Sequence, residues 1–241
     1  MKRIIAFILL TSMLVLAMVG CNNPDDKDNT PKFDPNVKSE GTMTYEQYAA
    51  AELDAEVVIE GYVQGKQSWW DNKASIYLQD GTGGYFVYEM TCTEAEYNSL
   101  VNGTKIKVTG YKTEYHGELE VDAGATFEII AGDTWVAPVT DVTDLLGTDE
   151  LVKKQNMFVC FKGMTVKAIT FKGGEPGDDI YVTLTKNGVD YDFCVERYLT
   201  APDTAVYQAV SALTAGQVID VEGFLYWYDG VNTHITGIAV Q

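Results

Sequence analysis

Apolar, β-branched and aromatic residues occur along this chain in short runs, separated by stretches rich in glycine, asparagine and aspartate. In the run SIYLQD, at residues 75–80, apolar and polar side chains alternate, which is typical of a β-strand with one buried face. Turn sequences such as DGTGG, at residues 80–84, close these runs. We therefore expect ten strands, at residues 56–67, 75–80, 84–90, 105–115, 119–130, 157–169, 179–185, 189–196, 218–228 and 232–240.

Short helices are expected between the strands. The segment TEAEYNSL begins with Thr93 and carries Glu96 three residues later, which is a capping-box pattern. The segment TYEQYAAAELDA precedes the first strand, and either Thr44 or Thr42 can cap its N-terminus. The remaining two segments are residues 141–154, before the sixth strand, and residues 202–213, which begin near Ala201 or Pro202.

One stretch of the sequence occurs twice. The segment that starts at Leu100 matches the segment that starts at Leu213 at a constant offset of 113 residues. Because an internal repeat of this kind reflects a repeated structural unit, each half should have the order β-β-β-α-β-β behind a short leading helix. The identical pairs are Leu100 and Leu213, Gly103 and Gly216, Val108 and Val221, Gly110 and Gly223, Tyr115 and Tyr228, and Gly117 and Gly230.

Five strands with a helix between the third and fourth are the pattern of the OB-fold, a five-stranded Greek-key barrel. The motifs VTG and VEG in the fourth strands, IYLQDGTGG at residues 76–84 and the leading helix resemble OB-fold modules of exported bacterial proteins, some of which are nucleic-acid-binding-like. We expect an all-β fold of two tandem OB-fold barrels, at residues 42–131 and 139–241. A single β-sandwich of about ten strands is the alternative, but two helices at matching points of the repeat argue against it.

The N-terminus has the pattern of an export signal. Lys2 and Arg3 precede an apolar run at residues 4–19, which is short for a membrane span. The sequence AMVGC that follows resembles the lipobox of bacterial lipoproteins. That resemblance implies a signal peptide at residues 1–20, a lipid on Cys21 and a disordered tether at residues 21–41. The expected location is the bacterial cell envelope, at the cell surface or outer membrane. An ordinary secretory peptide with an incidental cysteine is the alternative.

The resemblance also implies where a ligand would bind. In OB-folds the binding face lies on the second and third strands, framed by the loops that join strands one to two and four to five. Aromatic side chains at these places could stack on bases or sugars, although strand tyrosines also commonly cover a barrel, and one tryptophan of the pair could anchor its loop. The candidate ligand-binding residues are Trp69, Trp70, Tyr77, Tyr88, Tyr115, His116, Trp227 and Tyr228, with Tyr85, Tyr181 and Tyr226 nearby in the sequence.

Charge narrows the choice of ligand. The formal net charge is −18, and such an acidic surface repels a phosphate backbone. Basic residues near the expected binding face are few, and the first loop of the second copy carries Glu175, Asp178 and Asp179. If either copy binds a nucleic acid, it should therefore be the first. The candidate basic residues are Lys66, Lys73, Lys112, Lys172 and Arg197.

Signatures of catalysis, metal binding and cofactor binding are missing from the sequence. Its two histidines, His116 and His234, lie at different places in the two copies, and no HExxH or GxSxG motif is present. Acidic pairs lack the spacing of a calcium loop. We expect no enzyme activity, cofactor or metal. Cys92, Cys160 and Cys194 are expected to be buried free thiols, with a Cys160–Cys194 bridge as the alternative.

These patterns favour a non-catalytic envelope lipoprotein with ligand-binding OB-folds. The ligand that the resemblance implies is single-stranded nucleic acid, and an oligosaccharide is the alternative because neutral sugars also stack on aromatic rings. A different class of function is an interaction or spacer module for another envelope protein, with no small ligand.

Overall fold

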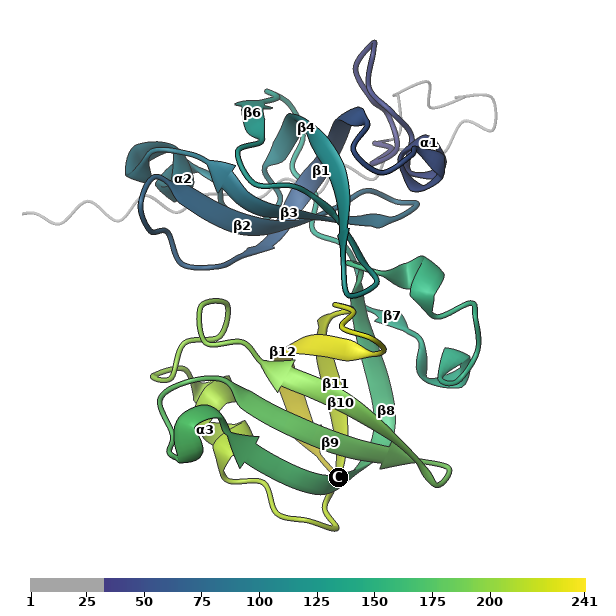
Figure 1. The fold of residues 1–241 in the computed structure, drawn as a ribbon, viewed down its shortest axis with the longest axis vertical. Helices are drawn as coiled ribbons and strands as arrows, with labels where there is room; N and C mark the ends of the chain where they lie inside the picture. Colours follow the sequence, from purple (N-terminus) through teal and green to yellow (C-terminus); the bar gives the residue numbers. More distant parts are fainter. Residues whose placement is uncertain (1–32) are drawn as a thin grey trace, which may run out of the picture. The chain divides into compact units, whose positions relative to one another are not determined.

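The first barrel is built around a long strand, β1 (Glu56–Lys66), which pairs with a different neighbour on each side. In this computed structural model, which describes residues 33–241, β1 pairs with β2 and with β4, and β3 pairs in parallel with β5 (Figure 1). The ring β1-β2-β3-β5-β4 is therefore closed. The other elements are α1 (Tyr45–Ala50), β2 (Lys73–Gln79), β3 (Gly84–Thr91), α2 (Glu94–Ser99), β4 (Lys105–Tyr115), β5 (Glu118–Val121) and β6 (Thr126–Ile129).

The second barrel repeats this ring. The strands β8-β9-β10-β12-β11 follow one another, β11 closes on β8, and β10 and β12 are parallel as β3 and β5 are. The structure thus confirms two tandem five-stranded barrels. The elements are β7 (Thr140–Asp141), β8 (Phe158–Phe171), β9 (Ile180–Lys186), β10 (Val189–Val195), α3 (Ala205–Ser211), β11 (Val218–Phe224) and β12 (Asn232–Val240), with 3₁₀ turns at Thr143–Leu145, Val152–Lys154 and Lys172–Gly174.

Each barrel has its own apolar core, filled from alternate positions of its strands. On β4, for example, Ile106 and Val108 point inward and are fully buried, while the alternating Lys105, Lys107 and Thr109 are partly exposed. Glycine is required where Gly110 follows them, because a Cβ there would lie 2.6 Å from Cγ1 of Val121. At the equivalent Gly223, a Cβ would lie 2.1 Å from the carbonyl oxygen of His234. The repeated glycine therefore lets the fourth strand pack closely inside both barrels.

The helix caps agree with the sequence at two of three places. Thr44 and Thr93 each accept a hydrogen bond from the backbone N–H three residues on, and both capping boxes are complete. The third helix begins later than expected. It starts at Ala205 instead of near Ala201 or Pro202, and its cap is Thr204, whose side chain accepts from the N–H of Tyr207. A threonine hydroxyl can cap a helix, whereas alanine and proline side chains have no acceptor.

Three predicted elements differ from the structure. Residues 141–154 form two 3₁₀ turns around Gly147, whose φ of +78° interrupts a helix. The strand expected at 119–130 is divided into β5 and β6 by a turn at Gly124, which also has a positive φ. The strand expected at 218–228 ends at Phe224, before a turn in which Asp229 and Gly230 have positive φ. Local turn chemistry overrode the apolar pattern in each case.

Residues 1–20 and Cys21, to which the sequence assigns the signal peptide and the lipid, lie outside the described residues. Within residues 33–241, no helix is long and apolar enough to span a bilayer.

The two barrels meet on the outer face of β2 and β3. Tyr77 from this face is fully buried, and its ring stacks on Phe224 of the second barrel with centroids 4.3 Å apart. The Tyr77 hydroxyl and Nδ1 of His234 are 2.8 Å apart and hydrogen-bonded. The backbone N–H of Phe158 donates to Oε1 of Gln79 at 2.8 Å. Part of the face that OB-folds use for ligands is therefore covered by the second barrel.

The junction depends on close backbone approach at Gly84, which generates a testable prediction. A Cβ at this position would lie 2.3 Å from the backbone carbon of Asn156. We expect Gly84→Ala to lower the free energy of unfolding by roughly 1–3 kcal/mol, because the backbone of the second barrel must shift. Urea denaturation measures the loss. The matched control is Gly237→Ala, where the nearest atom is 3.5 Å away, and equal stability of the two variants would contradict the prediction.

Candidate ligand-binding groove

Three adjoining cavities form one groove along both barrels. The first, of about 500 Å³, shares Gln67 and Tyr88 with the middle cavity, of about 670 Å³. The middle cavity shares Tyr181, Tyr228 and Asn232 with the third, of about 580 Å³. Because neighbouring cavities share wall residues, they adjoin one another along the surface of the two barrels.

The two adjacent tryptophans of the first loop have different roles. Trp69 packs against the core of the first barrel, and its indole N–H donates to the carbonyl of Cys92 at 2.9 Å. Trp70 is 62% exposed and lines the first cavity. Asp71 and Asn72 have positive φ and form the tight turn between Trp70 and Lys73, which directs the chain back into β2. One tryptophan therefore anchors the loop and the other is presented to solvent.

Exposed rings continue through the middle of the groove. Tyr88 and Tyr115 come from the first barrel, and Tyr181 and Tyr228 come from the second. All four are exposed. Strand alternation places Tyr88, Tyr115 and Tyr181 on the outer faces of the barrels, and Tyr228 lies in the turn after β11. Tyr198, which follows β10, is also exposed and lines the first cavity together with Trp70. The cavities also include the less exposed rings of Phe86, Tyr191, Phe193, Tyr226, Trp227 and His234.

The turns between the fourth and fifth strands of the two barrels contact each other. Nδ1 of His116 lies 2.9 Å from Oδ2 of Asp229, and the backbone N–H of Asp229 donates to the carbonyl of His116 at 2.7 Å. The His116 ring also stacks on Tyr228, with centroids 4.2 Å apart. His116 and Asp229 are equivalent positions of the repeat, since they differ by 113 residues. This contact brings Tyr115 and Tyr228 to the same wall of the groove.

The structure separates the eight candidate residues into different environments. Trp70, Tyr88, Tyr115, Trp227 and Tyr228 line the groove, whereas Trp69 anchors a loop and His116 belongs to the contact between the turns. Tyr77 presents no surface to a ligand, because it lies in the junction of the barrels. Sequence reasoning did not select Tyr198, since no motif surrounds it and it acquires its place only when the second barrel packs beside the first.

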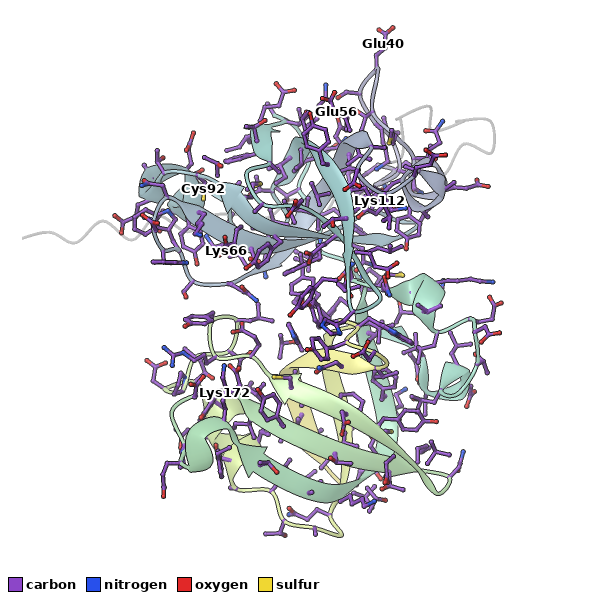
Figure 2. All side chains as sticks on the ribbon, viewed as in Figure 1. Glu40, Glu56, Lys66, Cys92, Lys112 and Lys172 are labelled. Carbon is purple, nitrogen blue, oxygen red and sulfur yellow. The ribbon has the colours of Figure 1, made fainter. Side chains whose placement is uncertain are left out.

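Acidic side chains near the groove are partly deprived of water. Burial raises the pKa of Glu120 and of Glu196 to about 7, and it raises the pKa of Glu118 well above its usual value. Burial also lowers the pKa of His234 to about 4, so this ring is neutral at pH 7. Lys73 and Lys172 are the basic groups that line the groove, and both are engaged by carboxylates, Glu89 at 2.7 Å and Asp179 at 2.9 Å (Figure 2 labels Lys172).

Cysteine and metal chemistry adds nothing to the groove. Cys92, Cys160 and Cys194 are free and buried, as expected, so the alternative Cys160–Cys194 bridge was wrong (Figure 2 labels Cys92). Cys160 on β8 and Cys194 on β10 are separated by β9, whose Tyr181 is the register partner of Cys194. Across residues 33–241, no group of histidine, cysteine, aspartate and glutamate side chains could hold a metal ion.

The fold is that of two tandem OB-fold barrels with an aromatic-lined groove. No protein-family model matches the chain, and no curated protein matches it significantly. Among solved structures, a murine DNA-binding protein bound to double-stranded DNA is similar at 11% identity and a TM-score of 0.37, over 76% of this chain and 94% of that one. A replication protein A heterotrimer bound to single-stranded DNA is similar at 12% identity and a TM-score of 0.31, over 77% and 49%. An Entamoeba histolytica asparaginyl-tRNA synthetase has 17% identity and a TM-score of 0.31, over 42% and 25%. Resemblances this weak do not identify a ligand.

The raised pKa of Glu120 predicts how pH affects stability. Its pKa is raised from 4.5 to about 7 in the folded state. Protonation of Glu120 therefore stabilises the folded state. This contribution is complete below pH 4.5 and is lost as the pH rises through 7. Glu120→Gln cannot ionise, so between about pH 5 and 8 it should gain roughly 1–3 kcal/mol of unfolding free energy relative to the wild type. Urea denaturation of both proteins measures this difference, in which all other titrating groups cancel. Parallel pH profiles would show that the carboxylate is not destabilised by burial.

Proposed function

We propose that this chain is a non-catalytic binding protein that holds a linear oligomer along the aromatic groove. The observation that carries the proposal is the row of exposed rings, from Trp70 through Tyr88 and Tyr181 to Tyr228, along three joined cavities. Flat rings stack on the faces of sugars and bases without demanding one sequence of units, and a long groove multiplies such contacts. OB-folds bind oligonucleotides and oligosaccharides through the same strands and loops.

Charge favours an oligosaccharide as the ligand. Both lysines of the groove are paired with carboxylates, so neither offers an uncompensated positive charge. A phosphodiester chain would meet repulsion along most of this surface, whereas an uncharged sugar chain would not. The acidic residues that line the groove are Glu89, Asp179, Asp190, Asp192, Glu196 and Asp229.

Single-stranded nucleic acid is the second candidate, and one observation favours it. At the first cavity, Nζ of Lys73 lies 5.0 Å from the centroid of the exposed Trp70 ring. A stacking platform beside a cation is the combination that single-strand binders use. Any nucleic acid would therefore be held at this end of the groove, on the first barrel, and its affinity would fall steeply with salt.

The cellular context of the proposal comes from the sequence. The lipobox-like AMVGC motif supports a lipid on Cys21, which would hold the binding groove at the bacterial envelope. A membrane-tethered receptor for extracellular oligomers would combine this lipid anchor with the aromatic groove. The alternative role, an interaction or spacer module for another envelope protein, requires no ligand in the groove.

A binding panel separates these functions. The full-length chain in mild detergent is tested against neutral oligosaccharides, single-stranded DNA and single-stranded RNA at low and moderate salt. We expect binding of a neutral oligosaccharide that is insensitive to salt, because stacking needs no ion pairing. Salt-sensitive binding of a single strand would establish the second candidate instead. Silence across the panel would overturn ligand binding and favour the protein-interaction module.

Trp70 supplies a test of the groove itself. We expect Trp70→Ala to weaken binding of the oligomer found in the panel by about tenfold, since one stacking platform is lost. Isothermal titration calorimetry measures the affinity. The control is Tyr111→Ala, which removes an equally prominent ring (56% exposed) on β4 that does not line the groove. An affinity that falls equally in both variants, or in neither, would place the ligand elsewhere.

A further inference from the structure

A carboxyl group is buried where the two barrels meet. Glu118, the first residue of β5, follows the turn between β4 and β5 and has no exposed surface. Its Oε2 accepts a hydrogen bond from the backbone N–H of Trp227, in the second barrel, at 2.8 Å. The amide side chain of Asn156, which precedes β8, lies beside the same carboxyl. Glu118 of the first barrel is therefore enclosed by residues of the second.

Two amide side chains of the second barrel bond the backbone on either side of Glu118. Oε1 of Gln155 accepts from the N–H of Leu119 at 3.2 Å, and its Nε2 donates to the carbonyl of Gly117 at 2.6 Å. Nδ2 of Asn156 donates to the carbonyl of Leu119 at 3.2 Å. These bonds exist only while the second barrel is docked on β5, so the burial of Glu118 depends on the same docking.

Three buried polar atoms around this carboxyl have no hydrogen-bond partner among the described residues. They are Oη of Tyr48, Oε1 of Glu118 and Oδ1 of Asn156. Buried polar atoms are normally paired, so three at one place need an explanation. An ionised carboxylate and an amide oxygen only accept hydrogen bonds, whereas a protonated carboxyl also donates one. A proton on Glu118 therefore supplies a donor that this part of the junction lacks.

The surroundings of Glu118 do not offset a negative charge. No cationic side chain acts on it in the described part of the chain. Lys112 of β4 lies on the far side of this cluster, where its Nζ is 5.5 Å from the centroid of the Tyr48 ring (Figure 2 labels Lys112). That Nζ donates to the carbonyls of Ala49 and Ala51 at 2.9 and 2.7 Å. The titratable side chains around Glu118 are Tyr45 and Tyr48 of α1, Tyr77 of β2, its register partner Tyr115 of β4, Glu120 of β5 and Tyr226 after β11.

These surroundings favour the neutral form of the carboxyl. Burial raises the pKa of Glu118 well above its usual value of 4.5, and the nearby Glu120 carboxylate raises it further. The hydrogen bonds from Asn156 and Trp227 act in the opposite direction but are outweighed. A buried carboxylate without a cation is costly, so ionisation of Glu118 works against the closed junction.

We propose that Glu118 is a proton-dependent latch between the barrels. The neutral acid fits the closed junction, where it donates a hydrogen bond to a neighbouring acceptor, whereas the carboxylate favours separation of the second barrel from β5. The walls of the middle cavity come from both barrels, so the proton on Glu118 also keeps the groove assembled. The latch acts on the conformation of the chain, whichever oligomer the groove binds.

The direction of the pH effect follows from the two states of the junction. In the open state the carboxyl is in water and has a pKa near 4.5, whereas in the closed state its pKa is raised. The latch is strongest below pH 4.5, where both states are protonated, and it weakens as the pH rises toward the closed-state pKa. One proton is released on opening in this interval, so the opening equilibrium should rise about tenfold per pH unit.

Hydrogen–deuterium exchange of the full-length chain in mild detergent measures this opening. The reporters are the backbone N–H groups of Leu119, Phe158 and Trp227, which donate across the junction. Glu118→Gln is the matched variant, because its amide is neutral and both accepts and donates. Comparison at equal pH cancels the intrinsic pH dependence of exchange. From about pH 5 upward, the ratio of wild-type to variant exchange should rise about tenfold per pH unit at the reporters, while peptides from β4 and β9 show no such rise.

A control and a second readout complete the test. Glu128→Gln, which removes an exposed charge on β6, should keep the wild-type pH dependence. Infrared spectroscopy detects the proton directly: at about pH 6, where exposed carboxyls are ionised, the wild type should show the C=O stretch of a buried carboxylic acid that Glu118→Gln lacks. Absence of this difference, or equal pH dependence of the reporters in wild type and Glu118→Gln, would overturn the latch. Exchange at β4 and β9 that rises in step with the reporters would also overturn it, because the barrels would then unfold rather than separate.

Discussion

The packing of Tyr77 against the second barrel is the contact on which the rest of the structure depends. The ring is fully buried between Phe86 of its own barrel and Phe224 of the other, and its hydroxyl is hydrogen-bonded to His234. Because the hydroxyl of a buried tyrosine needs a partner, this bond specifies one orientation of the barrels as well as stabilising it. The groove exists only in that orientation, since its walls come from both barrels.

Much of the fold could be predicted from local pattern. The ten strands, the repeat at an offset of 113 and the capping boxes at Thr44 and Thr93 follow from residue types at fixed spacings. The candidate binding site was harder to predict from the sequence. Tyr77 and Tyr181 stand at matching points of the two copies, yet Tyr77 is fully buried and Tyr181 is 45% exposed. This difference in exposure arises because Tyr77 contacts the second barrel. The sequence pattern within one copy gives no information about contacts with the other copy. Tyr198 and Glu120 acquire their surroundings in the same way.

The two copies have therefore diverged in how they use the same surface. In the first copy, the outer face of β2 and β3 is largely devoted to holding the second barrel. In the second copy, the corresponding face on β9 and β10 remains open and supplies Tyr181 and Asp192 to the groove. The same packing buries the carboxylates of Glu118 and Glu120, and burial raises their pKa. The protonation of acidic groups near the groove therefore depends on how the barrels pack.

The contact between the repeated turns depends on a difference between the two copies. His116 and Asp229 occupy the same position of the repeat and face each other. In a symmetric dimer of identical single barrels, this place would hold two histidines or two aspartates, which cannot form the hydrogen bond between an imidazole and a carboxylate that is seen here. A single chain that carries both copies can hold different residues at the two equivalent positions, and this chain holds a histidine at one and an aspartate at the other. Two copies in one chain thus permit an interaction that two-fold symmetry forbids, and neither copy alone could recreate it by self-association.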